Sequence, residues 1–150
     1  MADIIIHDHS GEVMRRIADA IPVALEAVGQ FVEGEVVIEI QSNPRREDTG
    51  LLKNSITHAI SGEGAAKKSY SADRPRRAGG PVESGTYSGT APEGTDTKQA
   101  VYIGTDVEYA VYVHEGTRRM TPNRFLKNAV ENNKDQIRRY VENEIKRALR

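Results

Sequence analysis

The sequence predicts an α+β fold in which a small, mostly antiparallel sheet of three to four strands packs against two long helices. Two amphipathic stretches, one near each end of the chain, predict the helices, and short segments rich in β-branched residues predict the strands. The connections between these segments contain no crossover helix, which favours antiparallel pairing. The 150 residues suit a single domain, and we interpret residues 1–150 as one domain.

The stretch from Gly11 to Ile40 is predicted to be helical. Its apolar residues recur at steps of three or four and form one stripe: Val13, Ile17, Ile21, Leu25, Val28, Val32 and Val36. Ser10 precedes this stripe as the expected N-cap. Pro22 interrupts it, so Pro22 either kinks one long helix or lies in the first turn of a second one. The β-branched residues over positions 36–40 leave a strand there as an alternative.

A second helix is predicted from Pro122 to Leu149, with Thr121 as its N-cap and Pro122 as its first residue. Apolar residues follow one face of this stretch, and Lys and Arg residues occupy most of the rest. A helix of that length extends over about 42 Å, which is longer than a small core needs. We therefore expect the distal part of this helix to pack against something other than the core.

Three short segments between the helices are candidate strands. Ser55–Ile60 places Ile56, His58 and Ile60 on one face of a strand, and Ala100–Gly104 is rich in residues that favour strands. Glu108–His114 fits either a strand or a helical turn, and we favour a strand at its end. These segments supply the sheet of three to four strands.

The segment Ser61–Gln99 is an insert of unusual composition. Its 39 residues include seven Gly, three Pro, five Ser and four Thr, and almost no large aliphatic residues. Connections longer than about 12–15 residues are uncommon inside a compact domain. The insert is either a disordered surface loop or a long, flexible hairpin arm that becomes ordered against neighbouring subunits or along a channel.

The net charge of −1 conceals an uneven distribution along the chain. Residues 1–60 carry ten acidic and five basic residues, whereas residues 118–150 carry four acidic and ten basic ones. Such asymmetry can orient subunits head to tail or place a basic end on an acidic partner. The alternative is two solvated helices whose faces differ by chance.

Composition disfavours several function classes. The chain has no Cys, which excludes disulfides, Cys-ligated zinc and thiol catalysis. Its 21 basic and 22 acidic residues do not fit a uniformly basic nucleic-acid binder. The apolar runs Ile4–Ile6 and Val36–Ile38 are far too short to span a membrane, and the first ten residues lack the features of a secretion signal. We expect a soluble protein without a membrane partner, made in the cytoplasm.

Two clusters contain residue types that carry chemistry. His7, Asp8 and His9 are possible metal ligands, but no partner of matching spacing accompanies them. Asp106, Glu108 and His114 suggest a hydrolase with paired acids and a base, but no nucleophile, phosphate-binding or dinucleotide motif is present. On a strand, His114 and its neighbour Glu115 would point to opposite faces. We therefore predict no catalytic, cofactor-binding or metal-binding residues and no enzymatic activity.

Three further segments carry short motifs: Asp48–Ile56 (DTGLLKNSI), Val101–Thr105 (VYIGT) with Tyr109–Thr117 (YAVYVHEGT), and Met120–Leu126 (MTPNRFL). In this order they resemble the small head–tail joining proteins of long-tailed double-stranded-DNA phages and prophages, also called neck or tail-completion proteins. In physical terms, the residues of these motifs favour turns and the ends of helices and strands. Asp48 and Gly50 suit a turn in which Gly50 takes a positive φ, and Gly116 lets the backbone turn sharply.

The resemblance implies a virion structural protein, without catalysis or cofactors, that forms a ring at the neck. The ring would be six-fold, to match a tail, and would lie between the portal and connector of the DNA-filled head and the tail-terminator or tail-tube proteins. The protein would assemble in the cytoplasm of the bacterial host. Two departures from the family pattern stand out. His114-Glu115 replaces an acidic–aromatic step, and Asn123-Arg124 separates Pro122 from Phe125.

Basic side chains are the candidate interface residues. We expect the acidic first helix and basic last helix to make contacts that close the ring, and the insert to make at most passing contact with DNA. The alternative function is a nucleic-acid-binding module that uses the basic insert and the last helix. The candidates are Lys67, Lys68, Arg74, Arg76, Arg77, Arg118, Arg119, Arg138 and Arg139.

Overall fold

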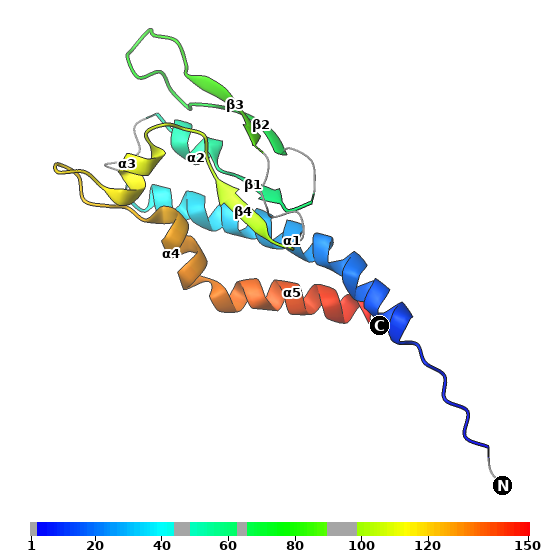
Figure 1. The fold of residues 1–150 in the computed structure, drawn as a ribbon. Helices are drawn as coiled ribbons and strands as arrows, with labels where there is room; N and C mark the ends of the chain where they lie inside the picture. Colours follow the sequence, from blue (N-terminus) through cyan, green and yellow to red (C-terminus); the bar gives the residue numbers. More distant parts are fainter. Residues whose placement is uncertain (1–2, 44–48, 63–65, 90–98) are drawn as a thin grey trace.

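The computed structural model describes residues 3–43, 49–62, 66–89 and 99–150. Within these ranges the chain is α+β, as the sequence predicts, with a long N-terminal helix and two small antiparallel ladders (Figure 1). The elements in chain order are α1 (Ser10–Gln41), α2 (Leu51–Ser55), β1 (Thr57–Ile60), β2 (Ala66–Ser71), β3 (Ser84–Gly89), β4 (Val101–Gly104), α3 (Ala110–Glu115), α4 (Phe125–Asn132) and α5 (Lys134–Ala148). Asp48, to which the sequence assigns part of a turn, lies outside the described residues.

Helix α1 is one uninterrupted helix of 32 residues that contains Pro22. Pro22 lies on the exposed side, whereas the apolar stripe is buried at Val28, Val32 and Val36. The alternative of a strand over residues 36–40 is wrong, because Val36 and Ile40 continue the buried stripe on the same face. The N-cap is His9 and not Ser10, whose backbone N–H instead donates to the Asp8 carboxylate at 2.8 Å.

The strands form two separate ladders of two strands each, and not one sheet, in the described part of the chain. Strand β1 pairs with β4, with His58 opposite Ile103, and this ladder lies on α1. The insert contributes the second ladder, because β2 and β3 pair with each other along Ala66–Ser71 and Ser84–Gly89. The insert is therefore a hairpin over residues 66–89, whereas its residues 63–65 and 90–98 lie outside the described ranges.

The single C-terminal helix predicted from Pro122 to Leu149 is wrong, since two helices, α4 and α5, occupy this stretch. They meet at Asn133, whose backbone leaves the helical region with φ −119° and ψ 18°. Its side-chain amide donates to the Ala129 carbonyl at 2.8 Å and to the Glu35 carboxylate at 3.2 Å, which holds the bend against α1. Helix α4 also begins three residues later than predicted, at Phe125, with Arg124 as its N-cap.

Two strand predictions also need correction. Residues 51–55 form helix α2, so the strand expected from Ser55 begins at Thr57. The segment Glu108–His114 ends in helix α3 and not in a strand, because the N–H groups of Val113 and Gly116 donate to carbonyls four residues earlier. Helix α3 buries Ala110 and leaves Val111 exposed, so burial follows a helical face despite the β-branched residues.

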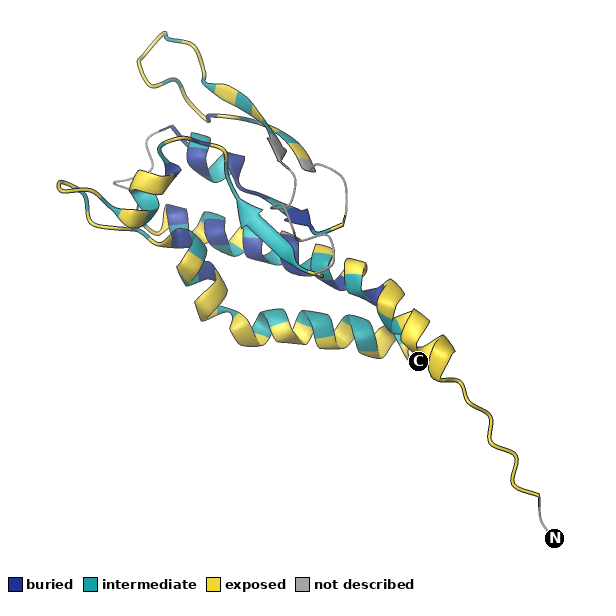
Figure 2. Cartoon of the chain, in the orientation of Figure 1, coloured by how far each residue is buried: buried dark blue, intermediate teal, exposed yellow. Residues whose placement is uncertain are grey.

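The core lies where α1, α2, the β1–β4 ladder and α4 meet (Figure 2). Phe125, Ile56 and Val36 have no exposed surface at its centre. Helix α5 contains no buried residue and packs its half-buried side along α1, with the Phe31 and Tyr140 rings 5.1 Å apart. Beyond this body, the first turns of α1 and residues 3–9 extend into solvent.

Candidate functional site

The three motif segments, which lie up to about 70 residues apart in the sequence, meet in space at one end of the β1–β4 ladder. The first segment contributes α2 and the approach to β1, the second contributes β4 and α3, and the third contributes the start of α4. We call this meeting point the junction and define it by Ser55, Thr105, Val113, Asn123 and Phe125.

A hydroxyl pair joins the first segment to the second. Ser55 has no exposed surface, and its Oγ donates to the Leu52 carbonyl at 2.7 Å. Its Oγ also lies 2.5 Å from Thr105 Oγ1, which in turn accepts from the Val107 N–H at 3.1 Å. Because the Ser55 proton is directed at Leu52, Thr105 is the donor within the pair. Both hydroxyl protons of this pair therefore have an acceptor.

The second and third segments are joined by backbone and ring contacts. The Asn123 N–H donates to the Val113 carbonyl at 2.9 Å, and the His114 and Phe125 rings are nearly perpendicular, with their centroids 5.1 Å apart. Gly116 makes this return possible with φ 80°, and a Cβ at Gly116 would lie 2.7 Å from the Met120 carbonyl oxygen. The prediction that Gly116 permits a sharp turn is confirmed.

The hairpin is held to α2 at its base. The Asp73 N–H donates to the Thr49 carbonyl at 2.8 Å, and the Asp73 carboxylate accepts from the Asn54 side chain at 2.8 Å. Lys53 Nζ lies 2.7 Å from the same carboxylate, and this contact lowers the pKa of Asp73 below its usual value. Gly50 has φ 82°, as its predicted turn requires, and a Cβ there would lie 2.5 Å from Asp73 Oδ2.

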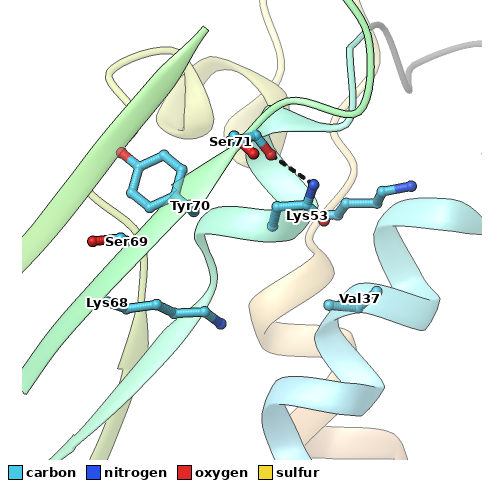
Figure 3. Close-up of a pocket in the computed structure, with 7 residues that line it drawn as sticks. Val37, Lys53, Lys68, Ser69, Tyr70 and Ser71 are labelled. Carbon is cyan, nitrogen blue, oxygen red and sulfur yellow. Dashed lines mark hydrogen bonds between the residues drawn. The ribbon is translucent and has the colours of Figure 1, made fainter. Parts of the chain in front are cut away.

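An open groove of about 610 Å³ separates the hairpin from α1 and α2 (Figure 3). Its two cations are engaged by the protein. Lys53 is paired with Asp73, and Lys68 donates to the Ile56 carbonyl and lies 3.8 Å from Glu33. Tyr70, on the same wall, donates to Asp106 at 2.6 Å. The groove therefore offers packing and hydrogen bonds between elements rather than free charge for an anion.

Tyr70 also ties the hairpin to the loop before α3. Burial first, and then the hydrogen bond to the Asp106 carboxylate, raise the pKa of Tyr70 to about 12. Gly85, opposite Tyr70 in the β2–β3 register, makes room for this side chain, because a Cβ there would lie 2.5 Å from the Tyr70 hydroxyl. The hydroxyl therefore stays protonated near neutral pH and acts as a donor.

His58 clamps β1 onto α1. Its Nδ1 lies 2.6 Å from a Glu33 oxygen and its Nε2 lies 3.0 Å from a Glu26 oxygen. Burial opposes the charged form of His58, but the hydrogen bonds to Glu26 and Glu33 outweigh burial and raise the pKa of His58 above its usual value. The ring lies directly over Gly29, where a Cβ would approach it to 2.4 Å. The sequence pattern does not predict this cluster of His58, Glu26 and Glu33.

The residues considered for hydrolysis do not form one site. The Asp106 carboxylate accepts from Tyr70, whereas His114 Nδ1 lies 2.7 Å from the Glu115 carboxylate. The expectation that His114 and Glu115 point to opposite faces is wrong, because both belong to the last turn of α3 and not to a strand. His114 lines a cavity of about 260 Å³ beside Phe125, and neither Asp106 nor Glu108 contributes to that cavity.

The structure places the basic candidates in three separate regions of the surface (Figure 1). Five lie on the hairpin and its connection, two in the turn after α3, and two on α5. Lys68 turns inward to the groove, and Arg76 lies 3.7 Å from Glu83. Arg138 and Arg139 are exposed, and within the described ranges neither forms an ion pair.

The part of the chain that the structure describes contains neither a metal-binding cluster nor a membrane-spanning helix. The rings of His7 and His9 stack 6.3 Å apart, but no group of three or more His, Cys, Asp or Glu side chains could hold a metal ion among the described residues. The helices in the same ranges all lack the combination of length and hydropathy that a membrane span requires.

The chain matches no protein-family model, no curated protein and no solved structure.

Proposed function

We propose that this protein is a structural subunit of a long-tailed phage or prophage particle. It assembles into a ring at the neck and joins the DNA-filled head to the tail. This role requires neither a substrate nor a cofactor. Its neighbours in the particle are the head connector on one side and the tail-terminator or tail-tube protein on the other. The ring is six-fold, in keeping with the symmetry of a tail.

The junction is the observation that carries this proposal. Short motifs scattered along a sequence gain weight when their residues contact one another, because a shared fold requires shared contacts. Ser55 of the first motif bonds Thr105 of the second, and Val113 of the second accepts from Asn123 of the third. The residues by which the chain resembles neck proteins therefore form one packed unit.

The distribution of charge supports assembly rather than catalysis. The engaged lysines of the groove and the separated residues of the hydrolase hypothesis supply no catalytic centre within the described ranges. In contrast, Arg138 and Arg139 on α5 are exposed and remain available to acidic surfaces of a neighbouring subunit. Contacts between two different surfaces of identical subunits close into rings when the rotation permits.

The test is electron microscopy of lysates from a phage or prophage that carries a stop codon in this gene. The proposal predicts DNA-filled heads beside separate, complete tails, and restoration of joined particles when the wild-type chain is supplied from a plasmid. Intact, infectious particles without the protein would overturn the proposal. Salt-dependent binding of DNA would then be the next activity to measure.

A further inference from the structure

Residues 3–9 form an arm that leaves three isoleucines in water. Ile4, Ile5 and Ile6 are 87%, 75% and 84% exposed, and the arm adopts neither helix nor strand in this structure. Figure 1 shows the arm running away from the body beyond the start of α1. Three adjacent exposed isoleucines are a marked cost for a soluble surface and indicate a site of interaction.

Among the described residues, one edge of strand β4 has no partner strand, and such an arm can pair with it. The Ser61 N–H donates to the Ala100 carbonyl at 2.9 Å, which fixes where hydrogen-bonded and non-hydrogen-bonded pairs alternate along the β1–β4 ladder. Tyr102 therefore directs its backbone groups to Ala59, whereas Val101 and Ile103 direct theirs to the outer edge. No further strand pairs with β4 among the described residues.

The other edges suit the arm less well. The outer side of β1 is approached by the hairpin, since Lys68 donates to the Ile56 carbonyl just before β1. Strand β3 (Ser84–Gly89) contains mainly Ser, Gly and Thr. Aliphatic and aromatic side chains favour one another across strands, so the sequence VYIG of β4 is the better match for three isoleucines.

The arm cannot reach this edge within its own chain. Ile103 is opposite His58, and His58 lies over Gly29, which is 19 residues along α1 from Ser10. That stretch of helix measures about 28 Å at about 1.5 Å per residue. Ile4 precedes Ser10 by six residues, and fully extended chain covers at most about 21 Å over that distance. An arm that pairs with this edge must therefore come from another molecule.

We propose that the arm of one copy adds as a strand to the outer edge of β4 in a second copy. The main-chain groups of Val101 and Ile103 supply the hydrogen bonds, and the isoleucine side chains extend the apolar ladder beyond its outer edge. The edge and the arm are different surfaces of the same chain, so the contact repeats from subunit to subunit. Its place in a neck ring rests on the proposed function, but the contact itself can be measured on the purified protein.

The first experiment compares self-association by sedimentation velocity over a range of concentrations. In the test variant, Ile4, Ile5 and Ile6 are replaced by Ser, and because all three precede α1 the folded body is unaffected. The association constant should fall at least about a hundredfold, since burial of one isoleucine contributes roughly tenfold or more. The control replaces the exposed Ile38 and Val82 by Ser, and it should associate like the wild type.

The second experiment measures amide hydrogen exchange at β4 in the assembled protein. The amides of Val101 and Ile103 should exchange about tenfold or more faster in the Ser variant than in the wild type, because they lose their partners. The Tyr102 amide faces β1 and serves as the internal control, with equal protection in both proteins.

Three results would overturn the contact: a wild-type chain that stays monomeric at every concentration, a Ser variant that associates like the wild type, or equal exchange at the edge amides. Failure of the arm contact can be told apart from failure of the neck proposal. If heads and tails separate when the gene is interrupted, the neck role stands without the arm. If the chain associates through its arm but particles stay intact, the contact stands and the neck role falls.

Discussion

Replacing Gly29 by alanine tests how β1 is held on α1. A Cβ at Gly29 would lie 2.4 Å from His58 Cδ2 and 2.6 Å from Cγ, closer than real contacts allow, so the imidazole must move. His58 is only 14% exposed, and its movement separates Nδ1 from the Glu33 carboxylate and Nε2 from the Glu26 carboxylate. The variant should therefore be less stable than the wild type.

Two opposing effects set the size of the change. The bond from His58 to Glu33 contributes about 1.5–3 kcal/mol because its partner is charged and three-quarters buried. The bond to Glu26, which is 48% exposed, contributes little. Alanine in place of glycine inside a helix restores about 1 kcal/mol. The net loss is about 0.5–2 kcal/mol, which corresponds to a fall in Tm of about 1–8 °C for a chain of this size.

Gly34→Ala is the matched control, because Gly34 lies in the same helix with nothing within 4 Å of a Cβ. It should raise the free energy of unfolding by about 1 kcal/mol. Thermal and urea unfolding of both variants gives the comparison. In a His58→Ala background the clash is gone, so Gly29→Ala should then stabilise the protein, and the double-mutant cycle reports the coupling.

The pH dependence of stability provides an independent check on the His58 clamp. The folded-state pKa of His58 is raised above its usual value of 6.5. The contribution of protonated His58 to the free energy of unfolding is therefore fully present below about pH 6.5, and it is lost as the pH rises through the raised pKa. His58→Ala should cost more stability at pH 6 than at pH 9. An equal fall in Tm on Gly29→Ala with and without the imidazole would refute the proposed contact between Gly29 and His58.

Three further predictions concern the turn after α3, the hairpin and α5. Gly116→Ala, with φ 80° and a Cβ 2.7 Å from a carbonyl oxygen, should lower the free energy of unfolding by at least about 2 kcal/mol in urea. Gly79→Ala has a similar φ of 76° but open space, and should cost only about 1 kcal/mol, so equal losses would contradict the steric argument. Tyr70→Phe should abolish the tyrosine that titrates at about 12 in an absorbance titration; persistence of that step would assign it elsewhere. Arg138→Glu with Arg139→Glu should leave monomer stability within about 0.5 kcal/mol yet impair assembly in light scattering, and full assembly would exclude a role for these charges.

The long N-terminal helix illustrates what periodicity can predict. A stripe repeated over many turns leaves one face to bury, and the structure buries that face from Ala20 to Ile40. Periodicity could not decide the role of Pro22, because an exposed proline inside a helix and a proline at a helix start give the same pattern. In the structure Pro22 is exposed on one side of α1, where a proline is tolerated within a single long helix.

The C-terminal helices show where local pattern fails. Apolar residues follow one face both before and after the polar run 131–136, which contains Asn132 and Asn133, so the pattern predicts one helix across that run. The bend depends on Asn133 bonding to Glu35, a residue 98 positions away, and no local signal encodes that contact. The same limit applies to α3, where β-branched residues favour a strand but packing of Ala110 and Phe125 favours a helix.

The candidate site divides in the same way. Gly50 and Gly116 were predictable as turn residues, and both have positive φ. The His58 clamp was not predictable, since it joins residues 25 and 32 positions apart, although a glycine in the apolar stripe of α1 was a hint of close approach. The basic residues of the insert were predicted as one cluster, but their geometry separates Lys68, which is engaged in the groove, from its exposed neighbour Lys67.

The most direct test of the neck role is to locate the protein in intact particles. A short affinity tag after Arg150, next to the half-exposed end of α5, can be labelled with gold and viewed by electron microscopy. The account predicts one cluster of label per particle, at the joint between head and tail. Label spread over the capsid or confined to the distal tail tip, or particles without label, would contradict it.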